Sequence, residues 1–167
     1  MTLLFAVTLA IIIQRLFELV LSRKNYLWAL AQGAREYGAQ HFPLFIVLHS
    51  LWILSFNLEW FLLKPPVPQG WPFLALAILA AQILRYWAIA SLGRRWNTRI
   101  LIIPGLSPVS SGPYRYFKHP NYIAVCIEIA AIPVLLGAWY TAAAFSLANA
   151  SLLIFIRIPA EERALDG

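Results

Sequence analysis

The residues best suited to chemistry lie at residues 112–122, just before and at the start of the fourth apolar run. This stretch carries Lys118, His119 and the tyrosines Tyr114, Tyr116 and Tyr122. A helix that begins at Asn121 would present unpaired N–H groups and a partial positive charge, which favour an anion such as the carboxylate of an amino-acid-like cofactor. The tyrosine rings could face a planar base or a cation. The same composition is also typical of an interfacial aromatic belt with basic anchors.

A second group of charged residues follows the last apolar run. Glu161 and Glu162 are adjacent carboxylates that could bind an ammonium group or a ribose diol. Arg157 precedes Glu161 by about one helical turn and could hold an acidic group on a lipid-like molecule. The alternative is a solvated, charged tail that caps the fifth helix.

Glu128 lies inside the fourth apolar run, where a charge is costly. On a helix it shares one face with Asn121 and Val125. It could be a base or an orienting carboxylate that faces an internal cavity. It could equally be a buried partner of Arg85 or Arg157, or a protonated carboxyl group.

The composition indicates the environment in which these residues must work. Of 167 residues, 61% are hydrophobic and only 12% are charged, with a mean hydropathy of +0.71. A soluble domain has roughly 25% charged residues, so a water-soluble single domain is excluded. The single cysteine allows no internal disulfide, and the three histidines lack the spacing of a zinc site, so no metal is expected. The net charge of +6 indicates membrane asymmetry rather than nucleic-acid binding.

The elements that must position these residues are apolar helices. Five apolar runs, at about residues 3–21, 41–63, 71–92, 121–136 and 139–156, predict an all-α integral membrane protein with about five transmembrane helices. The short link between the last two predicts a carboxyl-terminal antiparallel hairpin. Residues 22–40 read as an interfacial segment and residues 157–167 as a solvated tail.

The connections between the runs predict an orientation. Ten Lys and Arg residues fall in the connections on one side and only Lys64 on the other. This places the amino terminus outside and the carboxyl terminus in the cytoplasm. The chain reads as one domain, residues 1–167, with a three-helix part at 1–92 and a cofactor-binding and catalytic part at 93–167.

Two motifs support a family resemblance. The sequence GPYRYFKHPNY at residues 112–122, followed by an apolar hairpin and then RIPAEER at residues 157–163, resembles the isoprenylcysteine carboxyl methyltransferase family of integral membrane enzymes. The resemblance covers residues 93–165. Lys118 stands where Arg is commoner, which keeps the charge but loses the bidentate fork.

The resemblance implies S-adenosyl-L-methionine bound at the cytoplasmic face, with Arg157 at the substrate, near the transferred methyl group. Glu128 or His119 would serve as a base if the acceptor were a phenol. The cofactor-binding residues that the resemblance implies are Arg99, Leu106, Ser107, Pro108, Val109, Tyr114, His119, Pro120, Asn121, Tyr122, Glu161 and Glu162.

A narrower resemblance concerns the acceptor. Residues 92–100, residues 121–139 and the string RLFEL at 15–19 are similar to small bacterial members that O-methylate alkylpyrones or alkylresorcinols. We therefore expect an O-methyltransferase of the bacterial inner membrane that acts on a lipophilic hydroxyl or a prenylcysteine-like carboxylate. Three alternatives remain: a phospholipid amine N-methyltransferase, an NADPH-dependent membrane reductase of related architecture, and a non-enzymatic membrane scaffold.

Overall fold

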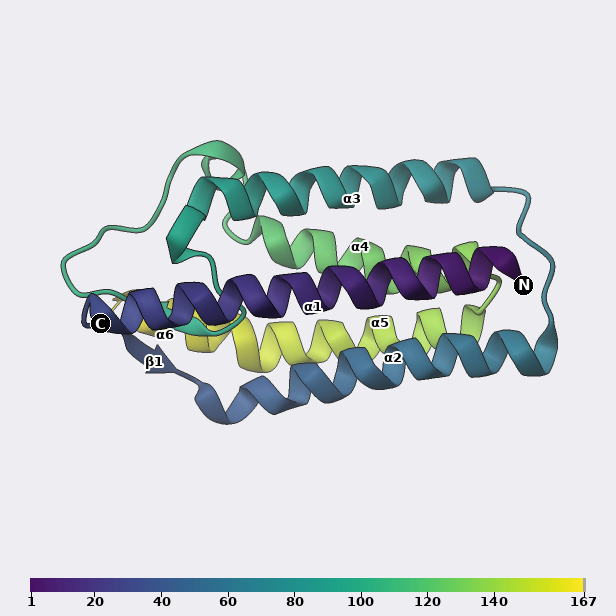
Figure 1. Cartoon of the computed structure of the whole chain (residues 1–167), viewed down its shortest axis with the longest axis horizontal. Coiled ribbons are helices and arrows are strands. Elements are labelled where there is room, and N and C mark those ends of the chain that lie inside the picture. Colours follow the sequence, from purple (N-terminus) through teal and green to yellow (C-terminus); the bar gives the residue numbers. More distant parts are fainter. Residues whose placement is uncertain (167) are drawn as a thin grey trace.

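The computed structural model describes residues 1–166 and shows long helices that run in alternating directions (Figure 1). The helices are α1 (Thr2–Ala31), α2 (Phe42–Leu63), α3 (Trp71–Leu92), α4 (Pro120–Leu135), α5 (Trp139–Leu152) and α6 (Ile158–Asp166). The short elements are β1 (Arg35–Tyr37), η1 (Ala39–His41), η2 (Gly93–Arg95), β2 (Ile100–Ile102), η3 (Gly112–Arg115) and the π-helix η4 (Leu153–Arg157).

The expected all-α membrane fold is confirmed. Four helical segments are long and apolar enough to cross a bilayer: Thr2–Ala31, Ala39–Leu63, Trp71–Arg95 and Trp139–Leu165. The fourth apolar run forms α4, which has only 16 residues and spans ~24 Å, less than the ~30 Å of a hydrocarbon core. α4 packs between α3 and α5, so protein rather than lipid covers much of it.

Two segments contain more helix than the sequence predicts. The segment from residue 22, predicted as interfacial, continues α1 as far as Ala31, because the chain has no glycine or proline before Gly33. The tail predicted as solvated forms α6 instead. Its alanines Ala160 and Ala164 are buried against Ile100 of β2.

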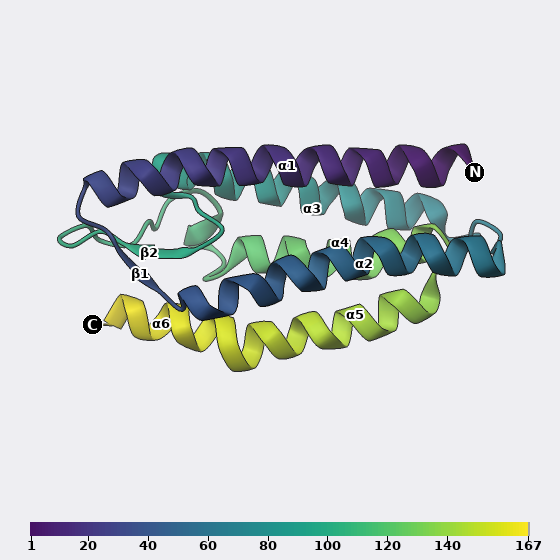
Figure 2. The ribbon, with the colours of Figure 1, turned by 60° about the horizontal axis from the view of Figure 1, so that its bottom comes forward.

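The predicted hairpin is present: α4 and α5 pack against each other and are joined by residues 136–138 (Figure 2). Gly137 closes this turn with a φ of +79°, in the left-handed region. A Cβ atom there would lie 2.7 Å from side-chain carbons of Pro65, so only glycine fits this approach.

The chain termini lie at opposite ends of the bundle, and the irregular segments gather at the end that holds the carboxyl terminus (Figures 1 and 2). We call this the basic end; it comprises residues 32–41, 93–119 and 158–166. Strands β1 and β2 pair there in antiparallel register, with Arg35 opposite Ile102, and tie two of these segments together. The apolar core occupies the other half of the bundle and includes Leu4, Ile11, Trp52, Phe56 and Ile132.

Candidate active site

The two motifs, separated by a whole hairpin in the sequence, meet at the basic end. The Tyr122 hydroxyl, in the first turn of α4, donates a hydrogen bond to the Glu161 carboxylate of α6. The same oxygen accepts a hydrogen bond from Arg157 Nε at 2.9 Å. We call His119, Tyr122, Arg157, Glu161 and Glu162 the Tyr122 cluster.

His119 forms the second side of this cluster. Its ring stacks on Tyr122 with 5.3 Å between ring centroids. Nδ1 lies 3.7 Å from Glu161 Oε1, and Nε2 lies 3.6 Å from Glu162 Oε1. Nε2 is buried and has no hydrogen-bond partner among residues 1–166. A buried polar atom without a partner is costly, which suits a group that takes its partner from a ligand.

Local backbone chemistry places both motifs. Pro120 is the first residue of α4, where its missing N–H is not needed, and it fixes the helix start beside His119. On the other element, the π-helix Leu153–Arg157 ends at Arg157, two residues before Pro159. Proline cannot donate to the preceding turn, and a π turn is a common local adjustment at functional sites. Arg157 therefore projects from the π-helical turn that joins α5 to α6.

Arg157 is buried without an ionic partner. Its side chain is 7% exposed, its Nη2 donates to the Thr98 carbonyl at 3.0 Å, and its guanidinium lies 5.8 Å from the centre of the Phe45 ring. No ion pair among the described residues involves it. A buried cation with no carboxylate in direct contact is unfavourable, so this site would stabilise an anionic oxygen.

Tyr114 approaches the cluster from η3, in the irregular segment of residues 93–119. It is partly buried in η3, and burial together with the negative charge of Glu161 raises its pKa above the ordinary value, so its hydroxyl stays protonated. Gly112, at the start of η3, has a φ of +61°, and a Cβ atom there would meet the Ser91 side chain of α3. The glycine of the first motif thus lets η3 lie against α3.

Several predicted cofactor residues lie elsewhere. Leu106, Ser107 and Pro108 are exposed and Val109 is partly exposed in the loop that follows β2. The described structure gives them no hydrogen bond or ion pair to the Tyr122 cluster; Ser107 offers its carbonyl to Arg95 at 2.8 Å. Arg99 pairs with Glu36 at 2.6 Å.

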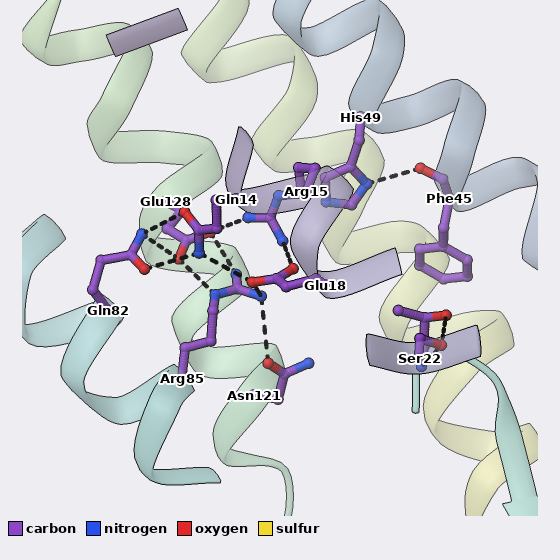
Figure 3. A network of polar contacts seen from close by, with 11 residues as sticks. Gln14, Arg15, Glu18, Ser22, Phe45, His49, Gln82, Arg85, Asn121 and Glu128 are labelled. Atoms are coloured by element: carbon purple, nitrogen blue, oxygen red, sulfur yellow. Dashed lines mark hydrogen bonds and ion pairs between the residues drawn. The ribbon is translucent and has the colours of Figure 1, made fainter. Parts of the chain in front are cut away.

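Glu128 lies in a separate ionic network inside the bundle (Figure 3). Arg85 Nε and Nη2 contact its two oxygens at 2.9 and 2.5 Å, and Arg15 Nη2 contacts one of them at 2.5 Å. Glu18 pairs with both arginines, so the four charges balance. Of the alternatives that the sequence left open for Glu128, the buried partner of Arg85 describes its position here. Asn121 faces this network, with Oδ1 3.5 Å from Arg85 Nη1.

The sequence did not point to Thr98, whose carbonyl accepts a hydrogen bond from Arg157, or to Ser22, which accepts one from the Thr98 N–H. A signal was present, because Gln14, Glu18 and Ser22 repeat every four residues and mark a polar face on an otherwise apolar helix. The structure buries Glu18 and Ser22 on that face.

A bundle with four helical segments long and apolar enough to cross a bilayer is the architecture of an integral membrane protein. Residues 73–167 match the isoprenylcysteine carboxyl methyltransferase (ICMT) family, and the chain belongs to this family. It is therefore a membrane methyltransferase, of a family that generally uses S-adenosylmethionine.

The relatives extend the similarity over nearly the whole chain. The protein YpbQ of Bacillus subtilis (strain 168) is 44% identical over 155 residues, which cover 93% of this chain and 92% of YpbQ. A protein of Haemophilus influenzae (strain ATCC 51907 / DSM 11121 / KW20 / Rd) is 29% identical over 166 residues, which cover 96% and 92% of the two chains. Both relatives are described as uncharacterized proteins. No solved structure matches the chain significantly.

Proposed function

We propose that this protein transfers a methyl group from S-adenosylmethionine to an acidic oxygen of a lipophilic acceptor. The observation that carries the proposal is Arg157, a buried cation that makes no ion pair among the described residues and reaches Glu161 only through the Tyr122 hydroxyl. An ionised oxygen would supply the missing counter-charge.

The donor set of the Tyr122 cluster fits the cofactor. Glu161 and Glu162 would hold an ammonium group or ribose hydroxyls, and the start of α4 would accept a carboxylate. Nε2 of His119, which makes no hydrogen bond among the described residues, would bind a further polar atom of the ligand. When bound, the cofactor supplies a methyl group on a positively charged sulfur. Tyr114 offers an aromatic face on the same side, from η3.

We propose that the loop of residues 106–109 is part of the cofactor site. The family resemblance assigns cofactor contacts to it, and in this structure it is largely exposed. We propose that it folds over the ligand when the cofactor binds, which would exclude water from the reacting atoms. We leave Arg99 out of the cofactor site, because Glu36 and the Phe42 ring engage its guanidinium.

Arg157 would act on the acceptor. Methyl transfer requires the attacking oxygen to be aligned with the carbon–sulfur bond, and a guanidinium with donors in fixed directions can hold an oxyanion in place. A carboxylate or an acidic enol is already ionised near neutral pH. A phenol, with a pKa of about 10, would be helped by the charge of Arg157 and by His119 as a base. We assign Glu128 no role as a base, since two arginines occupy its oxygens.

The acceptor would reach Arg157 from the bilayer with its apolar tail between helices, and the cofactor would enter at the basic end. We propose that this end faces the cytoplasm, because ten of the thirteen Lys and Arg residues belong to it or to its helix ends. The amino terminus then lies outside.

The test is methyl transfer by the purified protein in lipid nanodiscs. Methyl-labelled S-adenosylmethionine is supplied with a long-chain alkylresorcinol, an alkylpyrone, S-farnesylcysteine or phosphatidylethanolamine, and products are identified by mass spectrometry. We expect a mass increase of one methyl group on an oxygen acceptor and none on the amine, since an ammonium group would sit beside Arg157. Methylation of phosphatidylethanolamine alone would overturn the oxygen assignment.

A binding experiment separates the remaining classes. We expect S-adenosylhomocysteine to bind in a calorimetric titration and NADPH not to bind, because Arg95 and Arg99 already have protein partners. Binding of NADPH in place of S-adenosylhomocysteine would indicate a reductase, and binding of neither would favour a scaffold.

A further inference from the structure

The position of Arg157 depends on a backbone atom of a distant segment. Arg157 Nη2 donates to the carbonyl of Thr98, which lies between η2 and β2. A carbonyl cannot adjust as a side chain does, so the placement of the guanidinium depends on what holds residues 96–98. We call these three residues the strap.

The strap is fixed by side chains of α1. The Thr98 N–H donates to Ser22 Oγ at 3.1 Å, and the Ser22 and Thr98 hydroxyls are 2.8 Å apart. Ser22 Oγ also donates to Asn97 Oδ1 at 2.9 Å, while Asn97 Nδ2 returns a hydrogen bond to the Ser22 carbonyl at 2.9 Å. Asn25 Nδ2 donates to the Trp96 carbonyl at 2.7 Å.

The two α1 side chains that make these contacts are buried. Ser22 and Asn25 are each 4% exposed. Trp96 has extended backbone geometry, and the sheet partners begin only at Ile100, so α1 rather than a strand supplies most hydrogen bonds of the strap. The Trp96 N–H donates to the Gly93 carbonyl of η2. The single proton of Ser22 Oγ goes to Asn97, and its lone pairs accept from Thr98, which satisfies the hydroxyl completely.

We propose that Ser22 and Asn25 are positioning residues for Arg157, so that α1 sets the geometry of the acceptor side through the strap. This inference rests on the proposed function, because it assigns Arg157 to the acceptor. It adds a contribution from α1, which lies before the part of the chain that matches the family. A displacement of the guanidinium by about an ångström would lower the rate sharply, since aligned displacement tolerates little error.

The first arm of the test compares Ser22→Ala with Ser151→Ala. Both changes remove a helix hydroxyl, but Ser151 is exposed and its hydroxyl donates only to its own helix, at the Leu147 carbonyl. We expect Ser22→Ala to lower methyl transfer to a long-chain alkylresorcinol by about tenfold or more through kcat. We expect its S-adenosylhomocysteine affinity, measured by calorimetry, to stay within about twofold. Equal losses of turnover and affinity would overturn the proposal.

The second arm separates a positioning role from simple loss of packing. Thr98→Val keeps the shape of the side chain and removes its hydroxyl, whereas Thr98→Ser keeps the hydroxyl that bonds to Ser22. We expect the valine variant to lose turnover and the serine variant to retain most of it. If both variants behave alike, the hydroxyl pair does not position Arg157 and the proposal fails.

The third arm does not depend on catalysis. Hydrogen exchange of the Thr98 amide and of residues 157–162, in nanodiscs, should speed up in Ser22→Ala and not in Ser151→Ala. Unchanged exchange would overturn the link between α1 and Arg157. If exchange changes but no acceptor is methylated even by the unaltered protein, the proposed function fails and the structural link stands.

Discussion

Two buried arginines in this bundle have opposite surroundings. Arg85, on α3, is 1% exposed and meets both oxygens of Glu128. Arg157, at the end of the π-helix, is 7% exposed and meets only a tyrosine hydroxyl, a backbone carbonyl and an aromatic ring. The first charge is neutralised within the protein. The second meets a carboxylate, Glu161, only through the Tyr122 hydroxyl.

This difference indicates that the Arg85 network has a structural role and that the surroundings of Arg157 are suited to binding a ligand. The network of Arg15, Glu18, Arg85 and Glu128 joins α1, α3 and α4, and each of its charges has a partner. A closed network of this kind can fix how helices sit relative to one another. Arg157 can donate hydrogen bonds to a ligand that binds beside it. An unpaired buried charge costs stability, and such costs are found at functional sites.

The largest expected effect is a loss of stability when the ion pair between Arg85 and Glu128 is removed. Glu128→Gln preserves volume but leaves Arg85 and Arg15 with Glu18 as their one carboxylate. We expect a loss of about 3–5 kcal/mol in unfolding free energy, because a buried charge loses its partner. Unfolding of the detergent-solubilised protein by denaturant measures it. Glu162→Gln, at an exposed carboxylate, is the matched control, and equal stability of the two variants would contradict the comparison.

Removing Arg157 should lower activity more than stability. Arg157→Ala removes a buried charge that has no ionic partner, together with its hydrogen bonds to Tyr122 and Thr98, so we expect a smaller change in stability than in Glu128→Gln. Methyl transfer should fall by about 100- to 1000-fold, as for loss of one preorganised donor. S-adenosylhomocysteine affinity should change little. If affinity falls as much as turnover, Arg157 belongs to the cofactor site.

Changes to Glu161 and His119 of the Tyr122 cluster should instead lower the affinity for S-adenosylhomocysteine. Glu161→Gln and His119→Ala are expected to weaken S-adenosylhomocysteine binding by about 10- to 100-fold, the value of a hydrogen bond to a charged group. Both proteins should remain folded, as judged by circular dichroism. Calorimetric titration gives the affinities, and unchanged affinity in both variants would remove the cluster from the cofactor site.

Sequence alone predicted much of this arrangement, for physical reasons that can be named. Apolar runs predict helices because a bilayer leaves the backbone no other partners, and the strings at residues 112–122 and 157–163 are local enough to recognise. The pairing of Glu128 stayed open because a helix face does not say which neighbour it meets. The dependence of Arg157 on Thr98 and Ser22 was missed because it runs through a carbonyl, and every residue has one.

The smallest expected effect is on stability and comes from the contact between η3 and α3 at Gly112. η3 lies against α3, the helix of Arg85, only because Gly112 has no side chain there. Gly112→Ala forces a left-handed φ on alanine and presses its Cβ atom against Ser91, so we expect a loss of about 1–2 kcal/mol. Gly70→Ala is the matched control, since nothing lies within 4 Å of its Cβ position and its φ is −78°. Ser91→Ala should restore part of the stability of Gly112→Ala, because it removes the hydroxyl that the new Cβ atom meets. If Gly112→Ala and Gly70→Ala have the same unfolding free energy, contact with α3 does not hold η3 in place. The Tyr114 side of the site would then be independent of the Arg85 network.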